Sequence, residues 1–188
     1  MLQLAPDDIR PILGYVANTG LRIGTALATE ASWIDFPNRR VTYPASAMKG
    51  RHRHVVDLGV AAQMFLEQAV HASPTRPFPF SYWNLLGHWM QVREKMGRPT
   101  LRLHDLRHSY ISNQLAAGTP IHVVQQLAAH RSLAVTALYA HATDEARKAA
   151  SERVQIGAEV PEAPPPIAPP AAVEPSRPRR TPVLRLVK

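Results

Sequence analysis

The sequence predicts a mainly α-helical fold with one small antiparallel β-sheet, an α+β arrangement. Apolar residues recur at helical spacing along most of the first 152 residues, and glycine, proline and serine divide that stretch into separate helices. Two short β-branched runs, at 39–45 and 53–59, flank a glycine-containing segment and indicate a hairpin. The chain has 188 residues, 45% of them hydrophobic, which suffices for one sizeable core.

The first half of the chain is expected to hold three helices and the hairpin. A helix over 6–18 stops at Gly20, because glycine readily adopts the left-handed conformation that closes helices. A second helix covers 21–31, and a third covers 60–70. The first strand of the hairpin must lie at an edge or end at Pro44, since proline lacks the N–H that a sheet needs.

Four further helices are expected at 82–96, 104–117, 121–129 and 133–152. Ser81 caps the first and Ser132 the last, because a serine hydroxyl accepts a hydrogen bond from a free N–H of the first turn. The second of these helices stops at Gly118. Thr119 is the expected N-cap of the third, with Pro120 in its first turn.

The composition changes near residue 152. Half of the 18 prolines lie in the last 36 residues. A segment of this kind cannot bury enough apolar surface to become ordered. We therefore expect a folded domain over 1–152 and a proline-rich, basic, disordered tail over 153–188, without ordered secondary structure from about 160 to 175.

The charge and composition bound the class of protein. The formal net charge of +8 favours a polyanionic partner, with nucleic acid first and an anionic membrane surface second. The sequence has no cysteine, so disulfides and thiolate chemistry are excluded, and a reducing cytoplasm is consistent with this. No apolar run approaches the roughly 20 residues that span a bilayer.

His104 and Arg107, in the stretch HDLRHSYIS, are the first candidates for binding a phosphate. They lie at i and i+3 of one predicted helix and so share a face. A planar guanidinium binds phosphate oxygens through paired hydrogen bonds, and an adjacent imidazole can donate to the same group. Taken alone, a solvent-exposed pair on an amphipathic helix is the simpler interpretation. Arg22, near a helix start, and Lys49, at the predicted hairpin tip, add two more cations.

His130 and Tyr139 are nine residues apart. One continuous helix would put them on opposite faces, since nine steps of about 100° end half a turn out of phase. A break at Ser132, with His130 before the cap, would let the two side chains converge. Without the other candidates, Tyr139 would be a buried helix tyrosine with Val135 and Ala142 on its face.

Four motifs follow one another along the chain: TGLRIG, MKGRHRHVVDLG, HDLRHSYIS and LAAHRSLAVTALYAH. Together they make residues 4 to 150 resemble the tyrosine recombinases, also called phage integrases. In the family's order, the motifs supply Arg22, Lys49, His104, Arg107, His130 and Tyr139. The steps between the last four, of 3, 23 and 9 residues, look like the family's common spacing. The resemblance implies the family's catalytic-domain fold.

The resemblance also implies a site-specific recombinase or integrase that breaks and rejoins double-stranded DNA. Tyr139 would attack a phosphate and form a 3′-phosphotyrosyl bond, while Arg22 and Arg107 hold the non-bridging oxygens. The two motif histidines would donate further hydrogen bonds, with His104 also handling the tyrosine proton. Lys49 would protonate the leaving 5′-oxygen. No metal, cofactor or ATP is implied.

The implied partners are double-stranded DNA and other recombinase protomers, with a tetramer in the synapse as one arrangement, and no membrane. The implied location is the cytoplasm, for a bacterial or phage-derived protein of a mobile element that is associated with the nucleoid when bound to DNA. Many family members carry a carboxylate three residues after the first arginine, where this chain has Thr25, so a slower enzyme is expected. Members usually also have an N-terminal DNA-clamping domain. Only 21 residues precede Arg22, so we expect a catalytic domain alone, a truncated remnant or a fragment.

Other interpretations remain. Residues 119–141 also fit a helix-turn-helix, which would make the chain a non-catalytic DNA-binding module. That interpretation leaves Arg22, Lys49 and the HDLR pair unexplained, so it ranks second. A third is an inactive integrase remnant. Four further histidines invite a zinc site, although their spacing fits no usual one: His52, His54, His108 and His141.

Overall fold

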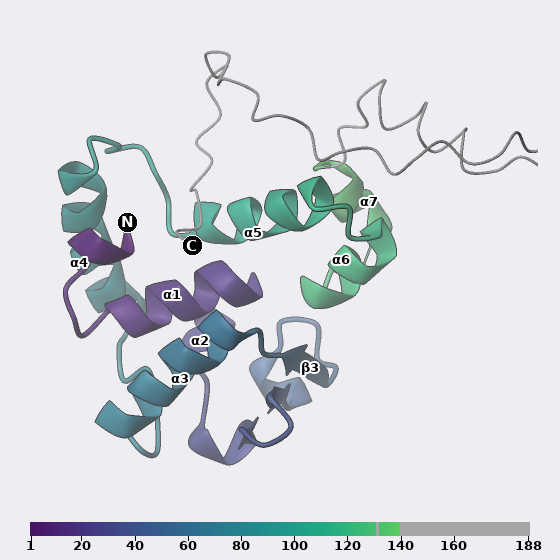
Figure 1. Cartoon of the computed structure of the whole chain (residues 1–188), viewed down its shortest axis with the longest axis horizontal. Coiled ribbons are helices and arrows are strands. Elements are labelled where there is room, and N and C mark those ends of the chain that lie inside the picture. The colour runs from purple at the N-terminus through teal and green to yellow at the C-terminus, as the bar shows by residue number, and fades with distance from the viewer. Residues whose placement is uncertain (131, 140–188) are drawn as a thin grey trace, which may run out of the picture. The chain divides into compact units, whose positions relative to one another are not determined.

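The computed structural model describes residues 1–130 and 132–139 and confirms a mainly helical fold with a small antiparallel sheet (Figure 1). The helices are α1 (Arg10–Thr19), α2 (Ile23–Leu27), α3 (Val60–Ala72), α4 (Tyr82–Lys95), α5 (Asp105–Ala116), α6 (Ile121–Leu127) and α7 (Leu133–Ala137). The strands are β1 (Ile34–Asp35), β2 (Arg40–Tyr43) and β3 (His54–Asp57). The predicted tail, and the last predicted helix beyond Tyr139, lie outside the described residues.

Several helices begin or end at the residues that the sequence predicts. Gly20 follows α1 with φ of 65°, and its N–H donates to the carbonyl of Val16 over 2.9 Å. The Ser81 hydroxyl accepts the first-turn N–H of Asn84 at the start of α4, at 3.1 Å. Ser132 caps α7 in the same way. These stops and caps are therefore confirmed.

Several predicted boundaries are wrong. The helix predicted over 133–152 ends at Ala137, and residues 138 and 139 form a turn. The first helix begins at Arg10 and not at residue 6, because Pro11 has no N–H to donate and fits only the first turn. α2 is only five residues long, and the Thr29 hydroxyl donates to the carbonyl of Ala26 where it ends. Thr119 does not cap α6. Its hydroxyl donates to Gln114 at 2.8 Å, and the N-cap is Pro120.

The three strands form one antiparallel sheet in the order β1-β2-β3. The hairpin of β2 and β3 is confirmed, and β2 ends at Tyr43, directly before Pro44. The sequence did not indicate β1, a two-residue strand paired with β2. The Tyr43 hydroxyl lies 2.9 Å from that of Tyr15 on α1 and 2.8 Å from that of Thr29, so buried hydrogen bonds fasten the hairpin to the helices.

The apolar core is divided into two clusters. The larger one joins α1 to α3, α4, the sheet and the start of α5, with fully buried side chains such as Trp89 and Leu66. The smaller one, Tyr110, Ile111, Val124 and Ala128, lies between α5 and α6, and Tyr139 packs against it. No helix in the described part of the chain is both long and apolar enough to cross a bilayer.

Candidate active site

Arg22 lies at the sharp corner between α1 and α2. Gly20 closes α1, Leu21 is buried, and Arg22 is the N-cap of α2. A Cβ at Gly20 would come within 2.2 Å of the Tyr110 ring, so only glycine allows this close turn. The turn leaves the half-buried Arg22 side chain beside an open pocket.

Lys49 lies on the connection between β2 and β3, as predicted. Met48 before it is buried and anchors the connection, while Lys49 itself is exposed. Arg51 and Arg53 are close in sequence and could have taken its place. Lys49 lines the pocket, whereas those two arginines are not among the lining residues. Lys49 is therefore the cation of the hairpin that is positioned at the pocket.

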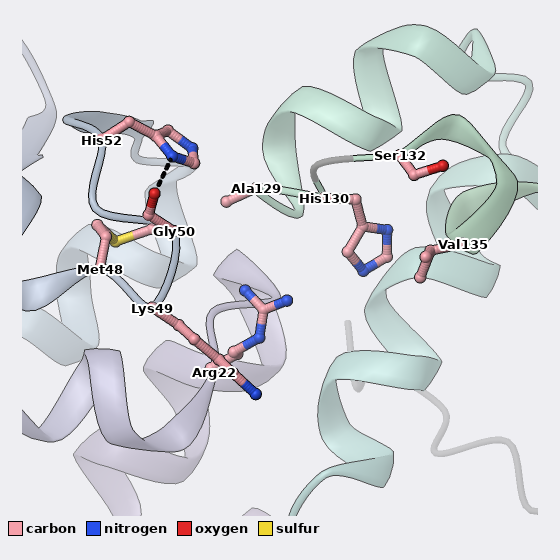
Figure 2. Close-up of a pocket in the computed structure, with 9 residues that line it drawn as sticks. All are labelled: Arg22, Met48, Lys49, Gly50, His52, Ala129, His130, Ser132 and Val135. Carbon is pink, nitrogen blue, oxygen red and sulfur yellow. Dashed lines mark hydrogen bonds between the residues drawn. The ribbon is translucent and has the colours of Figure 1, made fainter.

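The pocket has a volume of about 270 Å³. Its lining residues are Arg22, Met48, Lys49, Gly50, His52, Ala129, His130, Ser132 and Val135. Figure 2 shows Arg22 and Lys49 on one side and His130 facing them from the other. Three of the six candidate residues thus line one basic pocket.

Arg107 does not line the pocket but lies buried beside it, with 3% of its surface exposed. The interpretation of Arg107 as a solvent-exposed helix residue is therefore wrong. Its guanidinium donates to the carbonyl of Gly20 at 2.6 Å and to that of Ala128 at 2.5 Å. Burial, together with the charge of Arg22, lowers the pKa of Arg107 to about 10. The guanidinium has further N–H groups that these two bonds do not use.

His104 is the N-cap of α5 and is exposed. Its ring meets that of His108 edge to face, with centroids 4.7 Å apart. Partial burial of the ring lowers the pKa of His104, and His108 and the nearby arginines lower it further. His104 thus lies near both arginines without lining the pocket.

His130 lies in the break between α6 and α7 that the sequence predicts at Ser132. Its Nδ1 is hydrogen-bonded to the Thr136 hydroxyl at 2.9 Å. Burial lowers the pKa of His130 to about 4, and the positive charges of Arg107 and Arg22 act in the same direction. The imidazole is therefore neutral near pH 7. In the tautomer that accepts the threonine proton, it can donate through Nε2.

Tyr139 lies in the turn after α7 and is half-buried. Its N–H donates to the carbonyl of Thr136, the residue whose side chain also holds His130. The Tyr139 hydroxyl is hydrogen-bonded to Nδ1 of His108, and the two rings stack with centroids 5.5 Å apart. Burial raises the pKa of Tyr139, and the charge of Arg107 opposes that shift.

His108 is the residue that sequence reasoning missed, since it was considered only as a zinc ligand. It follows His104 by four residues and so shares its helix face, which is the signal the sequence did carry. The sequence could not show that α7 brings Tyr139 to that face. His104, His108 and His130 are called the site histidines below. Burial lowers the pKa of all three.

The structure gives no support to a zinc site at the histidines that it describes. Within residues 1–130 and 132–139, no three His, Cys, Asp or Glu side chains are grouped to hold a metal ion, and His141 lies outside that part. His52 hydrogen-bonds the carbonyl of Gly50 through Nδ1 at 3.0 Å. Thr25, at the position where the family commonly has a carboxylate, is buried in α2.

The fold is that of tyrosine recombinase catalytic domains. It matches the crystal structure of XerA recombinase with a TM-score of 0.61 and 20% identity, over 81% of this chain and 60% of that one. It matches XerH site-specific recombinase, bound to its difH substrate in a pre-cleavage complex, with a TM-score of 0.65 and 17% identity, over 80% of this chain and 50% of that one.

The chain belongs to the Phage integrase family, whose sequence profile matches residues 5–146. It is 40% identical over 155 residues to tyrosine recombinase XerC of Roseiflexus sp. (strain RS-1), covering 72% of this chain and 49% of that protein. It is 25% identical over 154 residues to XerC of Herpetosiphon aurantiacus, covering 74% and 50%. The resemblance carried by the four motifs is therefore confirmed. The chain spans about half the length of these curated relatives.

Proposed function

We propose that this chain is the catalytic part of a site-specific DNA recombinase that cleaves and rejoins strands through a 3′-phosphotyrosyl intermediate, without metal or ATP. The observation that carries the proposal is the convergence of Arg22, Lys49 and His130 on one pocket from distant parts of the chain. Buried Arg107 and half-buried Tyr139 lie beside it, close enough for the charge of Arg107 to act on both His130 and Tyr139.

Each residue has a role that fits its surroundings. Arg22 and unused N–H groups of Arg107 hold the non-bridging oxygens of the scissile phosphate, where negative charge builds up. His130 donates from the opposite wall, and His104 donates from the start of α5. Lys49, the exposed cation on the hairpin connection, protonates the leaving 5′-oxygen. Tyr139 is the nucleophile. The covalent bond to tyrosine conserves the phosphodiester energy, so rejoining needs no ATP.

The proposed partners are double-stranded DNA and further protomers of the same protein, with a synaptic tetramer as the proposed assembly. The net charge of +8 supports a DNA partner, and binding should weaken steeply with salt, because each neutralised phosphate releases counterions. The solved XerH complex contains its difH substrate, which supports the same partner here. We propose the cytoplasm of a bacterium as the place of action.

A trapping experiment tests the proposal. The full chain is mixed with a pool of nicked duplexes, randomised around the nick, whose cleavage releases a short fragment and so prevents rejoining. With chelator present and no added metal, the wild type should accumulate a protein–DNA adduct that survives denaturation. Tyr139→Phe should form none, since the nucleophilic oxygen is gone while the ring still packs.

Two comparisons make the result specific. Lys49→Ala should slow adduct formation on ordinary DNA but much less on DNA with a 5′-thiol leaving group, which needs no protonation. An adduct that persists in Tyr139→Phe would show that another residue is the nucleophile. A wild-type chain that binds DNA reversibly and never forms an adduct would refute the enzyme and favour the non-catalytic module or the inactive remnant.

A further inference from the structure

Within the described residues, the side chain that hydrogen-bonds the hydroxyl of the proposed nucleophile is that of His108. Its Nδ1 is hydrogen-bonded to the Tyr139 hydroxyl, and the two rings stack. His104, for which the motif implied the handling of the tyrosine proton, contacts the His108 ring, and no hydrogen bond joins it to Tyr139 in the described part of the chain.

We propose that His108 is a catalytic residue that accepts the phenolic proton of Tyr139 during strand cleavage. This inference rests on the proposed function, because it concerns the same reaction. As Tyr139 Oη forms a bond to phosphorus, the phenolic proton passes to Nδ1 of His108. The bond from phosphorus to the 5′-oxygen breaks, and that oxygen takes a proton from Lys49. Both proton transfers reverse when the strand is rejoined.

The surroundings of His108 fit a base. It lies directly after Arg107 on α5, and the charge of Arg107 also favours the phenolate form of Tyr139. The ring stacks on that of Tyr139 and meets that of His104 edge to face, and these two contacts restrict its orientation. A general base must lie within hydrogen-bond reach of the proton that it removes, and of the site histidines it is His108 that the structure places there.

Burial of the ring, more than the charges around it, favours the unprotonated form of His108 near neutral pH. Burial lowers its pKa, Asp105 raises it, and Arg102 and Arg107 lower it, with a net shift downward. His104 and His130 are the titratable neighbours on which His108 acts in turn. A neutral imidazole has one ring nitrogen without a proton, and that nitrogen can accept a hydrogen bond. For His108 to accept the hydroxyl proton of Tyr139, this nitrogen must be Nδ1.

The first test compares three variants in the trapping assay. His108→Ala should slow adduct formation by about 10²–10⁴-fold, the usual contribution of a positioned base, and added imidazole should restore part of the rate. His108→Asn keeps a hydrogen-bonding group near Nδ1 but is not basic, so it should stay slow. The control, His71→Ala, removes an exposed histidine on α3 and should react like the wild type.

The second measurement reads the proton directly. The ¹⁵N shifts of the His108 ring in the full chain at pH 7.5 should show a bare Nδ1 and a protonated Nε2, and Tyr139→Phe should change the Nδ1 shift. A proton on Nδ1 would overturn the inference whatever the rates are.

The rates separate the two proposals. A wild type that forms adduct while His108→Ala or His108→Asn reacts equally fast overturns the role of His108 and leaves the recombinase standing. A wild type that forms no adduct overturns both. His108→Ala could also react slowly without any rescue by imidazole. If His108→Asn then reacts equally slowly and has a lowered melting temperature, His108 has a packing role, and its role as general base is overturned.

Discussion

Replacing Arg107 should lower both the stability and the activity of the protein, whereas replacing Arg22 should lower the activity alone. The structure uses Arg107 as a cross-link. Its guanidinium ties α5 to Gly20, two residues before Arg22, and to Ala128, two residues before His130. The Arg22 side chain has no hydrogen bond or ion pair within the described residues and faces the pocket instead. Both residues are proposed to hold the same phosphate.

The magnitude follows from the two carbonyl bonds. A hydrogen bond to a charged group contributes about 1.5–3 kcal/mol, so Arg107→Met removes roughly 3–6 kcal/mol of favourable interaction. Relief of a buried cation next to another arginine offsets part of this. We therefore expect a net loss of about 2–4 kcal/mol, which lowers the melting temperature of a chain of this size by roughly 4–16 °C. Arg22→Met should change stability by less than about 0.5 kcal/mol.

Thermal unfolding followed by circular dichroism at pH 7.5, paired with the trapping assay, measures both effects. Arg107→Met should lose stability and adduct formation, and Arg22→Met should lose adduct formation alone. Arg107→Lys should fall between wild type and Arg107→Met in stability, because a point-like ammonium cannot reproduce the guanidinium fork. Equal melting temperatures for the two methionine variants would refute the role of Arg107 as a cross-link. A larger loss of melting temperature in Arg22→Met than in Arg107→Met would refute it as well.

Three further perturbations test the scaffold and the electrostatics. Tyr43→Phe leaves the buried hydroxyls of Tyr15 and Thr29 short of a partner and should lower the free energy of unfolding by about 1–3 kcal/mol in urea titrations. Gly20→Ala should cost about 2 kcal/mol or more, because the Cβ would meet Tyr110 at a left-handed φ, and the thermal midpoint should fall accordingly. The site histidines have lowered pKa values, so the unfolded chain binds more protons than the folded chain once the pH drops below their ordinary value of about 6.5. Their contribution to the free energy of unfolding is therefore fully present above about pH 6.5, and it is lost as the pH falls below that value. The urea midpoint should therefore be lower at pH 5.5 than at pH 7.5, and a midpoint that rises on acidification would contradict the burial of the neutral rings.

The sequence predicts the elements whose boundaries depend on local chemistry. Gly20 ends α1 because glycine can adopt the left-handed backbone conformation, and Ser81 begins α4 because its hydroxyl accepts a first-turn N–H. Both residues act as expected. Thr119 fails as a cap because its hydroxyl finds Gln114, a partner on the preceding helix, at 2.8 Å. β1 could not be predicted because a strand of two residues has no recognisable periodicity, and its pairing with β2 is a tertiary contact.

The candidate site shows the same division. The identities of the six motif residues can be read from the sequence, and so can the short separation of His104 and Arg107 along it. The burial of Arg107 and the contact between His108 and Tyr139 depend on how α5 meets the end of α1 and the turn after α7. Those are contacts between residues 87 and 31 positions apart, and no local pattern encodes them.

The structure holds the proposed phosphate-binding groups and the proposed proton donor in different ways. Arg107 fixes the corner that bears Arg22 and the break that bears His130, because it binds the backbone just before each of them. Lys49 is held differently, by a hairpin connection anchored through Met48 and exposed at its tip. Groups that stabilise charge in a transition state are most effective when they need not reorganise, which suits the fixed arginine and histidine. A proton donor must follow an oxygen that moves away as its bond breaks, and the long, rotatable side chain of an exposed lysine suits the role proposed for Lys49.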